Sequence, residues 1–332
     1  MYKISEINDK NIWDSFIRKV SPQSYFQSYN FGEAAKMENI SVQRIGVFKH
    51  QELIAVAQIT PVKAKRGRFL HIRNGPVVHP QNLDCLKYLF TEIERMAKKV
   101  NASFIRISPL IAETPENKQI LKSLGFQNAP IHAMDGEYVW VLDLDKPKDE
   151  LLQNMRKTTR YLIKKGQKMG VEVIQSSDLK DFFSLYHETS RRHGFVEHKG
   201  IENEFNIFHK EGNAILYTGK YQGKLIAGAV IVFYANQAVY RHGASAPSGI
   251  PASYLIQWEA INEAKSRGLP VYNFFGIAPP EKKDHPWAGI TLFKTGFGGR
   301  PVSYIHTLDK VLSARYALTY SVELLRKISK GY

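Results

Sequence analysis

The stretch GVFKHQELIAVA at residues 46–57 is matched by YTGKYQGKLIAGA at residues 217–229. In both stretches apolar residues flank a short polar segment, which is the pattern of two β-strands joined by a tight turn. A chain that returns to the same hairpin so far along its length is typical of a duplicated domain. The pair of hairpins therefore predicts two copies of one fold.

The similarity continues downstream of each hairpin, in the order strand, helix, short strand and a turn of the Leu-Gly-Phe type. The matched segments lie at residues 68–74 and 238–244, 86–99 and 254–267, 103–107 and 271–275, and 121–126 and 292–297. The separation is 172 residues between Leu53 and Leu225 and 171 residues between Gly125 and Gly296. Such constancy indicates one repeat rather than scattered likenesses.

The order of elements within each copy indicates a mixed α/β class, and the period is too long for a solenoid. We expect two tandem domains, residues 1–145 and 146–332, with the boundary between Asp143 and Pro147. The amphipathic C-terminal stretch, residues 309–330, is expected to pack on the second domain, with docking to a membrane as the alternative.

The composition is that of a folded, basic protein, with 43% hydrophobic residues and a formal net charge of +15. That charge favours a polyanionic partner such as one carrying phosphates. The N-terminus lacks the apolar core of a signal peptide, so a cytoplasmic location is expected. No run of heptads predicts a coiled-coil arm, so a monomer is expected. Cys85 is the only cysteine and excludes a disulfide framework. The histidines lack zinc-site spacing, which predicts no metal.

A basic segment separates the two copies, and it predicts a helix that begins at Asp145 and ends at Gly170. Its apolar residues recur at helical spacing, whereas its cations fall within one arc. The cationic set is Arg156, Lys157, Arg160, Lys164 and Lys168. This arc suits a phosphate backbone, and a solvated surface helix is the alternative.

Two motifs resemble the Fem-type (FemABX) family of peptidoglycan aminoacyl transferases. One is the Arg- and Lys-rich segment NMRKTTRYLIKK at 154–165, and the other is LFKTGFGG at 292–299, similar to the family's terminal Phe-Lys and Gly-Phe-Gly. An Asp is common in the family where this chain has Asn273 or Ser108, so acidic contacts are not expected there. The helical arm of some members is absent, and the likeness is to the compact form.

The resemblance implies two tandem domains of the acetyltransferase fold known as GNAT, and transfer of an amino acid from aminoacyl-tRNA to an amine of the precursor's stem peptide. It implies a catalytic role for Lys294 beside Phe293, and no cofactor. The implied substrate-binding residues are Lys36, Arg191 or Arg192, Tyr240 and His242, and the implied tRNA-binding residues are Arg156, Lys157, Arg160 and Lys164. Strand alternation predicts that Tyr240 and His242 share one face.

Several alternatives stay open at this point. An acyl-CoA-dependent N-acyltransferase has the same fold, although neither copy carries the Gly-rich pyrophosphate loop that would favour it. A non-catalytic protein that binds RNA or precursor would need only the basic helix. The acceptor is either UDP-MurNAc-pentapeptide or a lipid-linked precursor, with peripheral membrane contact possible in the second case. We expect the first domain to hold the precursor and the second to hold the charged tRNA.

Overall fold

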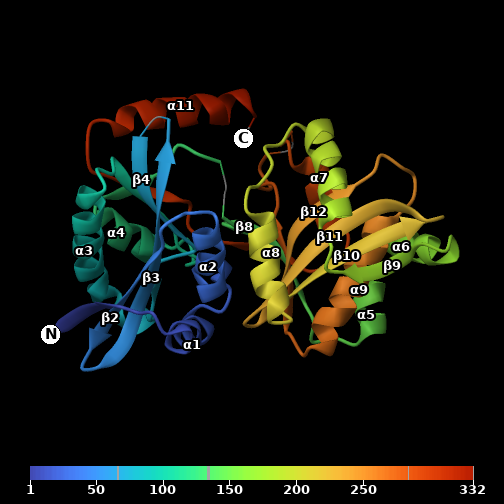
Figure 1. The fold of residues 1–332 in the computed structure, drawn as a ribbon, viewed down its shortest axis with the longest axis horizontal. Coiled ribbons are helices and arrows are strands. Elements are labelled where there is room, and N and C mark those ends of the chain that lie inside the picture. The colour runs from blue at the N-terminus through green and yellow to red at the C-terminus, as the bar shows by residue number, and fades with distance from the viewer. Residues whose placement is uncertain (66, 133–134, 283, 332) are drawn as a thin grey trace. The chain divides into compact units, whose positions relative to one another are not determined.

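The computed structural model describes residues 1–65, 67–132, 135–282 and 284–331. The chain divides into two compact units, each with its own sheet and core (Figure 1). The first unit consists of Met1–Tyr138, Ala278–Ala288 and Val302–Tyr332, and the second of Val139–Ile277 and Gly289–Pro301.

The first unit is built on the sheet β1-β2-β3-β4-β6-β15-β7, with β5 beside β3. Its strands are β1 (Tyr2–Glu6), β2 (Gln43–Lys49), β3 (Glu52–Ala64), β4 (Gly67–Arg73), β5 (Val77–Val78), β6 (Phe104–Ser108), β7 (Phe126–Asn128) and β15 (Leu308–Val311). Its helices are α1 (Lys10–Val20), α2 (Tyr29–Met37), α3 (Leu86–Lys99), α4 (Pro115–Ser123) and α11 (Tyr316–Ser329), with short 3-10 turns at Tyr25–Gln27 and Pro80–Cys85. The apolar face of α3 and the strands form its core.

The second unit is built on the sheet β14-β8-β13-β12-β11-β10-β9. Its strands are β8 (Tyr138–Asp143), β9 (Glu172–Ser176), β10 (Ala214–Tyr221), β11 (Lys224–Tyr234), β12 (Gln237–Ser245), β13 (Val271–Gly276) and β14 (Arg300–Ser303). Its helices are α5 (Lys148–Asn154), α6 (Lys157–Lys168), α7 (Lys180–His193), α8 (Ile201–Lys210), α9 (Ala252–Ser266) and α10 (Ala288–Thr295).

The two copies share details that confirm the repeat. Each hairpin turns on two residues with positive φ, His50 and Gln51 in the first and Gln222 and Gly223 in the second. Such turns match the natural twist of a two-residue hairpin. Each hairpin also carries a bulge just after its turn, where Ile54 of β3 and Ile226 of β11 are the extra residues.

Reading the strands outward gives the same order in both sheets, but the copies exchange one strand. The chain passes from β7 in the first sheet to β8, which lies between β13 and β14 in the second. It later passes from β14 to β15, which lies between β6 and β7 in the first. The first unit therefore does not end where the repeat in the sequence suggests, because it also includes Val302–Tyr332.

This exchange corrects two expectations. The division at 145/146 assigned the whole C-terminal part to the second domain, whereas Val302–Tyr332 belongs to the first unit. The stretch from Asp309 was expected to pack on the second domain, but β15 pairs with β6 and β7 instead. The physical reason is a buried ion pair. Asp309 is fully inaccessible and accepts two hydrogen bonds of 2.7 Å from the Arg106 guanidinium.

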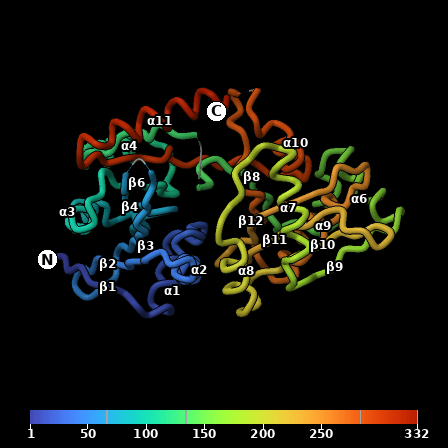
Figure 2. The backbone as a smooth tube through the Cα atoms, turned by 45° about the horizontal axis from the view of Figure 1, so that its top comes forward, coloured from blue at the N-terminus to red at the C-terminus, as the bar shows by residue number. Residues whose placement is uncertain are grey.

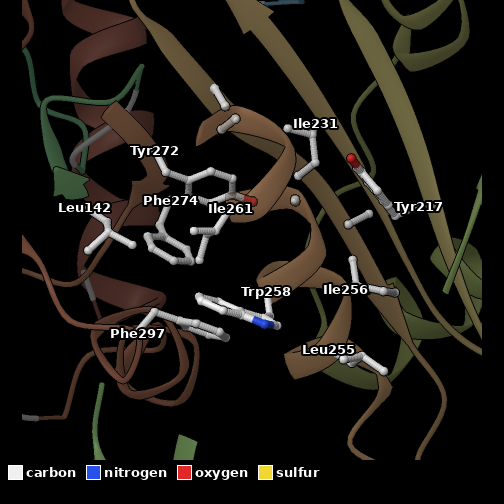
Figure 3. Close-up of a cluster of buried hydrophobic side chains, with 14 of the residues drawn as sticks. Leu142, Tyr217, Ile231, Leu255, Ile256, Trp258, Ile261, Tyr272, Phe274 and Phe297 are labelled. Atoms are coloured by element: carbon white, nitrogen blue, oxygen red, sulfur yellow. The ribbon is translucent and has the colours of Figure 1, made fainter. Parts of the chain in front are cut away.

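Two helical layers enclose the second sheet. Ala227 of β11 belongs to the core under α9, whereas a Cβ on the next residue, Gly228, would meet Phe182 of α7 at 2.8 Å. Successive strand residues point to opposite faces, so α9 and α7 cover different sides. Figure 3 shows the core on the α9 side, where Trp258 and Phe297 lie beside Phe274.

Candidate active site

The second sheet opens where its two parallel strands part. β12 and β13 pair at Gln237–Val239 with Val271–Asn273, and no pair follows along the described residues of these strands. Beyond that point β12 continues along β11 to Ser245, whereas β13 bends at Phe275, which has a φ of 64°. Separated parallel strands leave backbone groups and side chains accessible to a substrate in the middle of a sheet.

Asn273 holds the bend in β13. Its Oδ1 accepts a hydrogen bond of 2.8 Å from the backbone N–H of Phe275, and its Nδ2 donates to Oε1 of Gln237 at 2.9 Å. A non-glycine residue with positive φ is costly, and a side-chain bond to the backbone offsets that cost. The position at which the family resemblance places an acid is therefore a structural amide here.

Lys294 points at the bend from α10. Its side chain is 8% exposed, and its Nζ donates a hydrogen bond of 2.6 Å to the carbonyl oxygen of Gly276, at the end of β13. The Nζ also lies 5.9 Å from the centroid of the Tyr240 ring. Burial lowers the pKa of Lys294 to about 7. The salt bridges of the described residues give it no carboxylate partner, so the cation lies in a site with carbonyl and aromatic surroundings.

Phe293 packs against two aromatic rings. Its ring lies 4.9 Å from that of Tyr254 and 5.3 Å from that of Phe297, both edge-on. These contacts fix the last turn of α10 against α9 and so orient Lys294. The prediction that Phe293 is catalytic remains untested, and the geometry gives it a positioning role.

The glycines after Lys294 allow the chain to pass close to β8. A Cβ on Gly299, whose φ is 95°, would lie 2.1 Å from the carbonyl oxygen of Val141. The carbonyl of Gly298 accepts a hydrogen bond of 2.6 Å from Nε1 of Trp140. The Gly-Gly pair of the terminal motif is thus a requirement of close backbone approach.

Tyr240 and His242 lie on opposite faces of the sheet, which corrects the alternation argument. The register shifts at this point, since Ile231 pairs with Tyr240 and Val230 with His242, and Arg241 is the extra residue of a bulge. Tyr240 packs against the core on the α9 side, whereas His242 lies near Tyr186 of α7 at 6.2 Å between ring centroids. Only Tyr240 is close to Lys294.

Burial shifts both groups toward their neutral forms. It raises the pKa of Tyr240 to about 12 and lowers the pKa of His242 to about 3. The charge of Arg241 adds to the effect at His242. Both side chains are therefore neutral at physiological pH, and neither is poised to exchange a proton.

The end of α7 distinguishes two adjacent arginines. Both arginines are exposed, and Arg192 donates a hydrogen bond of 2.5 Å to the carbonyl oxygen of Ser245, the last residue of β12. Arg192 thus ties α7 to the strand that leads into the site. Whether either arginine binds substrate stays a prediction.

The basic segment forms two helices, not the one that was expected. α5 begins at Lys148 and ends at Asn154, and α6 begins at Lys157, because Met155 has extended backbone angles. Gly170 ends the segment with a φ of 75°. The expectation of one continuous helix is therefore wrong, and contact of Arg156 and Arg160 with tRNA stays a prediction.

Those two arginines are bound to backbone carbonyls. Arg160 donates to the carbonyl oxygen of Met155 at 2.7 Å, in the break between α5 and α6. Arg156 donates to the carbonyl oxygen of Leu292 at 3.0 Å and to Oγ1 of Thr295 at 3.1 Å. A cation at a helix C-terminus is favourable, so Arg156 supports the turn that carries Lys294. Lys157 and Lys164 are exposed.

Lys36 lies in the first unit, near the end of α2. Its Nζ is 2.9 Å from Oε1 of Glu33, which also lies 2.9 Å from Nη1 of Arg44. The side chain is exposed, and its role toward the precursor stays a prediction.

The first unit contains a polar cluster that the sequence did not reveal. Asp135 is buried, with Oδ1 2.7 Å from Nε of Arg73 and Oδ2 3.1 Å from both Nε2 of His71 and Oγ of Ser108. Burial raises the pKa of Asp135, but the charges and hydrogen bonds of Arg73 and His71 together outweigh burial and hold the pKa well below its usual range. No motif surrounds Asp135, so only the fold brings these residues together.

Two kinds of feature are absent from the described residues. No three His, Cys, Asp or Glu side chains in residues 1–65, 67–132, 135–282 and 284–331 gather as a metal site would require. In the same ranges no helix combines the length and the apolar character needed to cross a membrane.

Known proteins resemble this chain along nearly its full length. The profile of the FemAB family matches residues 9–202 and 197–323. Aminoacyltransferase FemA of Staphylococcus aureus is 22% identical over 399 aligned positions, which cover 92% of this chain and 94% of FemA.

Two solved structures share the architecture. The crystal structure of FemX superimposes with a TM-score of 0.83 at 21% identity, covering 97% of this chain and all of that one. A tandem GNAT protein from the clavulanic acid biosynthesis pathway has a TM-score of 0.61 at 10% identity, covering 93% of this chain and 98% of that one. The expected fold of two GNAT-like domains is confirmed, and the chain belongs to the FemAB family.

Proposed function

We propose that this protein is an aminoacyltransferase that moves an amino acid from aminoacyl-tRNA to an amine of the stem peptide of a peptidoglycan precursor. Membership of the FemAB family and the likeness to FemA support the transfer reaction. In the reaction the amine attacks the ester carbonyl, a C–N bond forms and the C–O bond breaks. The proton lost by the amine ends on the ribose hydroxyl that leaves.

The position of Lys294 carries the proposal. Ester aminolysis passes through a tetrahedral intermediate with negative charge on oxygen, and a preorganised donor in a dry site stabilises that charge. The bond to Gly276 uses one of the three donors of the ammonium group. The others serve a carbonyl oxygen that enters where β12 and β13 part. Such a reaction needs positioning and a donor, and it needs no protein nucleophile.

The proposed roles of the two units differ. The charged tRNA binds the second unit, where Lys157 and Lys164 of α6 are exposed in the same unit as Lys294. The precursor binds the first unit, where Lys36 is exposed on α2. Arg191 or Arg192, at the end of α7, is a further candidate for substrate contact in the second unit. The acceptor is a UDP-linked muramyl pentapeptide or its lipid-linked form.

The test is reconstitution with charged tRNA and a muramyl-pentapeptide precursor, followed by mass spectrometry of the product. We expect an amide-linked product, and Lys294→Ala should lower kcat by about 100- to 1000-fold, the cost of removing one oxyanion donor. The matched control is Lys265→Ala, since Lys265 also lies in the second unit and also donates to a backbone carbonyl, that of Leu144 at 2.8 Å.

Two outcomes would contradict the proposal. Equal activity of the Lys294→Ala and Lys265→Ala variants would remove Lys294 from catalysis. Turnover with acetyl-CoA in place of charged tRNA would establish an acyl-CoA-dependent N-acyltransferase instead.

A further inference from the structure

The C-terminal helix α11 of the first unit is amphipathic, but it buries its polar side and exposes its apolar side. Polar groups lie on the side that it buries: the Tyr316 hydroxyl donates to Oδ2 of Asp309 at 2.9 Å, and Glu323 lies 2.7 Å from Nη2 of Arg106. Thr319 is buried on the same side. These contacts attach the helix to its own unit through specific polar bonds, and they leave its apolar residues to the other side. Figure 2 traces the backbone of α11 at the C-terminal end of the chain.

The outward side of α11 is apolar. Leu318, Leu325 and Ile328 are 59%, 65% and 68% exposed, and Leu324 lies next to them. At 100° per residue these four side chains span an arc of about 120°, within which the helix carries no charged residue. A contiguous apolar stripe facing water is rare on a soluble protein and marks a surface that something covers.

Cations border this stripe. At 100° per residue Arg315 and Arg326 lie beyond one edge of the stripe and Lys327 beyond the other, and the only acidic residue of the helix, Glu323, is already bound to Arg106. The charge available to a partner is therefore of one sign. A protein partner of mixed charge would leave this bias unexplained, whereas an anionic surface matches it.

A second cationic element lies in the same unit. The hairpin between β3 and β4 exposes Lys63, Lys65 and Arg68. Its base is linked to the approach to α11 through Ser103, whose N–H donates to the Arg68 carbonyl at 2.7 Å and whose carbonyl accepts from the Leu312 N–H at 2.9 Å. The packing continues from Phe69 to Phe104 at 4.5 Å and from Phe104 to Tyr316 at 4.9 Å. The hairpin and the start of the helix are thus joined by backbone hydrogen bonds and by ring packing.

We propose that α11, with the stripe Leu318, Leu324, Leu325 and Ile328 and its cationic border, binds the surface of an anionic lipid bilayer. The helix is 14 residues long, about 21 Å, which is too short to cross the hydrocarbon core and suits a position in the plane of the interface. Apolar side chains enter the headgroup boundary while Lys and Arg contact the lipid phosphates. The inference concerns binding alone and does not depend on the transfer reaction.

The experiment is sedimentation of the full-length protein with phosphatidylcholine vesicles that contain or lack phosphatidylglycerol. We expect binding only with phosphatidylglycerol, weakened by salt because the attraction is screened. The double variant Leu325→Ser, Ile328→Ser should lower the partition coefficient by about tenfold or more, since two buried aliphatic side chains are removed. The control is Ile12→Ser on α1, which removes an apolar side chain 52% exposed elsewhere in the same unit.

Three results would overturn the proposal. The first is absence of wild-type binding to anionic vesicles, and the second is equal loss in the Ile12→Ser control. The third is a wild-type dimer in analytical ultracentrifugation that the double variant abolishes, since the stripe would then be covered by a second copy. Thermal unfolding of the variants checks that they fold, and none of these measurements uses aminoacyl transfer.

Discussion

The two copies treat the carboxyl ends of their parallel strands in opposite ways. In the first unit β4 and β6 stay paired through Arg73 and Ser108, and the end is closed by the buried carboxylate of Asp135. In the second unit β12 and β13 part after Val239 and Asn273, and a buried lysine takes the place of an ion-pair network. One copy has neutralised its buried charge internally, and the other keeps a cation available to a ligand.

The first copy closes a further opening with a side chain. Gln27 lies between β3 and β4, where its Oε1 accepts from the Gln58 N–H at 2.7 Å and its Nε2 donates to the Arg73 carbonyl at 2.7 Å. A Cβ on Gly75 would meet this side chain at 2.7 Å. The glutamine thus replaces a missing strand partner.

The largest expected effect breaks the closed copy. Asp135→Ala leaves Arg73 and His71 without their carboxylate, and removing one partner of a buried ion pair costs about 3–5 kcal/mol of unfolding free energy. Urea denaturation measures the loss. The control is Asp143→Ala, because its ion pair with Arg300 is exposed and should contribute less than about 1 kcal/mol.

Acid should reproduce this loss in the wild-type protein. The pKa of Asp135 is lowered in the folded state, so its contribution is complete above the unfolded pKa near 3.8 and disappears as the pH falls below it. A variant Asp135→Ala that matches the Asp143→Ala control in stability would show that the cluster does not close the first unit.

The next effect has the opposite sign and lies in the open copy. The folded pKa of Lys294 is about 7 and the unfolded value 10.5, so between these values the unfolded state binds more protons. The cost of burying the charge is complete below pH 7 and fades toward pH 10.5. The pKa difference corresponds to a burial cost of roughly 4 kcal/mol at pH 7, and the lost hydrogen bond to Gly276 offsets about 1 kcal/mol of the gain. Lys294→Met should therefore raise the unfolding free energy by about 3 kcal/mol at pH 7, with the gain vanishing toward pH 10.5.

The same variant should lose transfer activity, and that combination is the signature of a site that trades stability for function. Lys265→Met is the matched control and should raise neither stability nor its dependence on pH. A Lys294→Met protein that is less stable than the wild type at pH 7 would place Lys294 among ordinary structural residues.

A smaller effect concerns the bend that opens β13. Asn273→Ala removes the hydrogen bond to the Phe275 N–H and should cost about 1–2 kcal/mol of unfolding free energy and lower kcat. Asn273→Asp keeps the acceptor for Phe275 and loses only the donor to Gln237, so it should keep more activity than Asn273→Ala. Equal kcat values for the two variants would mean that the bend does not position the site.

The sequence revealed the repeat because local signals encode it. Paired polar turns at His50 and Gln222, together with the matched helices α3 and α9, lie within short windows of residues. The exchanged strand β15 could not be predicted. It has four residues, Leu308–Val311, and its place in the first sheet is stabilised by the ion pair of Asp309 with Arg106, 203 positions away. Pairing of this kind depends on long-range contacts that no window contains.

The site shows the same limit at finer scale. Lys294 was predicted from its motif. Its burial beside Gly276 and Tyr240 depends on how β12 and β13 separate, and no pattern of residues displays that separation. The bulge at Arg241 reversed the predicted faces of Tyr240 and His242, because one extra residue inverts strand alternation. The break at Met155 likewise replaced the one expected helix with two, and it gave Arg156 and Arg160 hydrogen bonds to backbone carbonyls that no pattern of residues displays.

The smallest expected effect concerns α6, the helix that precedes β9 in the second copy. Lys157 and Lys164 are its exposed cations among those predicted to contact tRNA, and Arg156 and Arg160 are unsuitable for a test because their removal would disturb the backbone that they hold. The double variant Lys157→Ala, Lys164→Ala should weaken tRNA binding a few-fold, and it should lower the slope of log affinity against log salt by about one per lysine.

Lys98→Ala with Lys99→Ala is the matched control, because this pair is also exposed near the end of a helix, α3 of the first unit. The double variants remove equal charge, so a general effect of net charge would shift both alike. A salt slope that falls only for the α6 variant would locate tRNA on the open copy. An equal fall in both would mean that the asymmetry of the sheets does not extend to RNA binding, since the phosphates would then follow the overall charge of +15 rather than one helix.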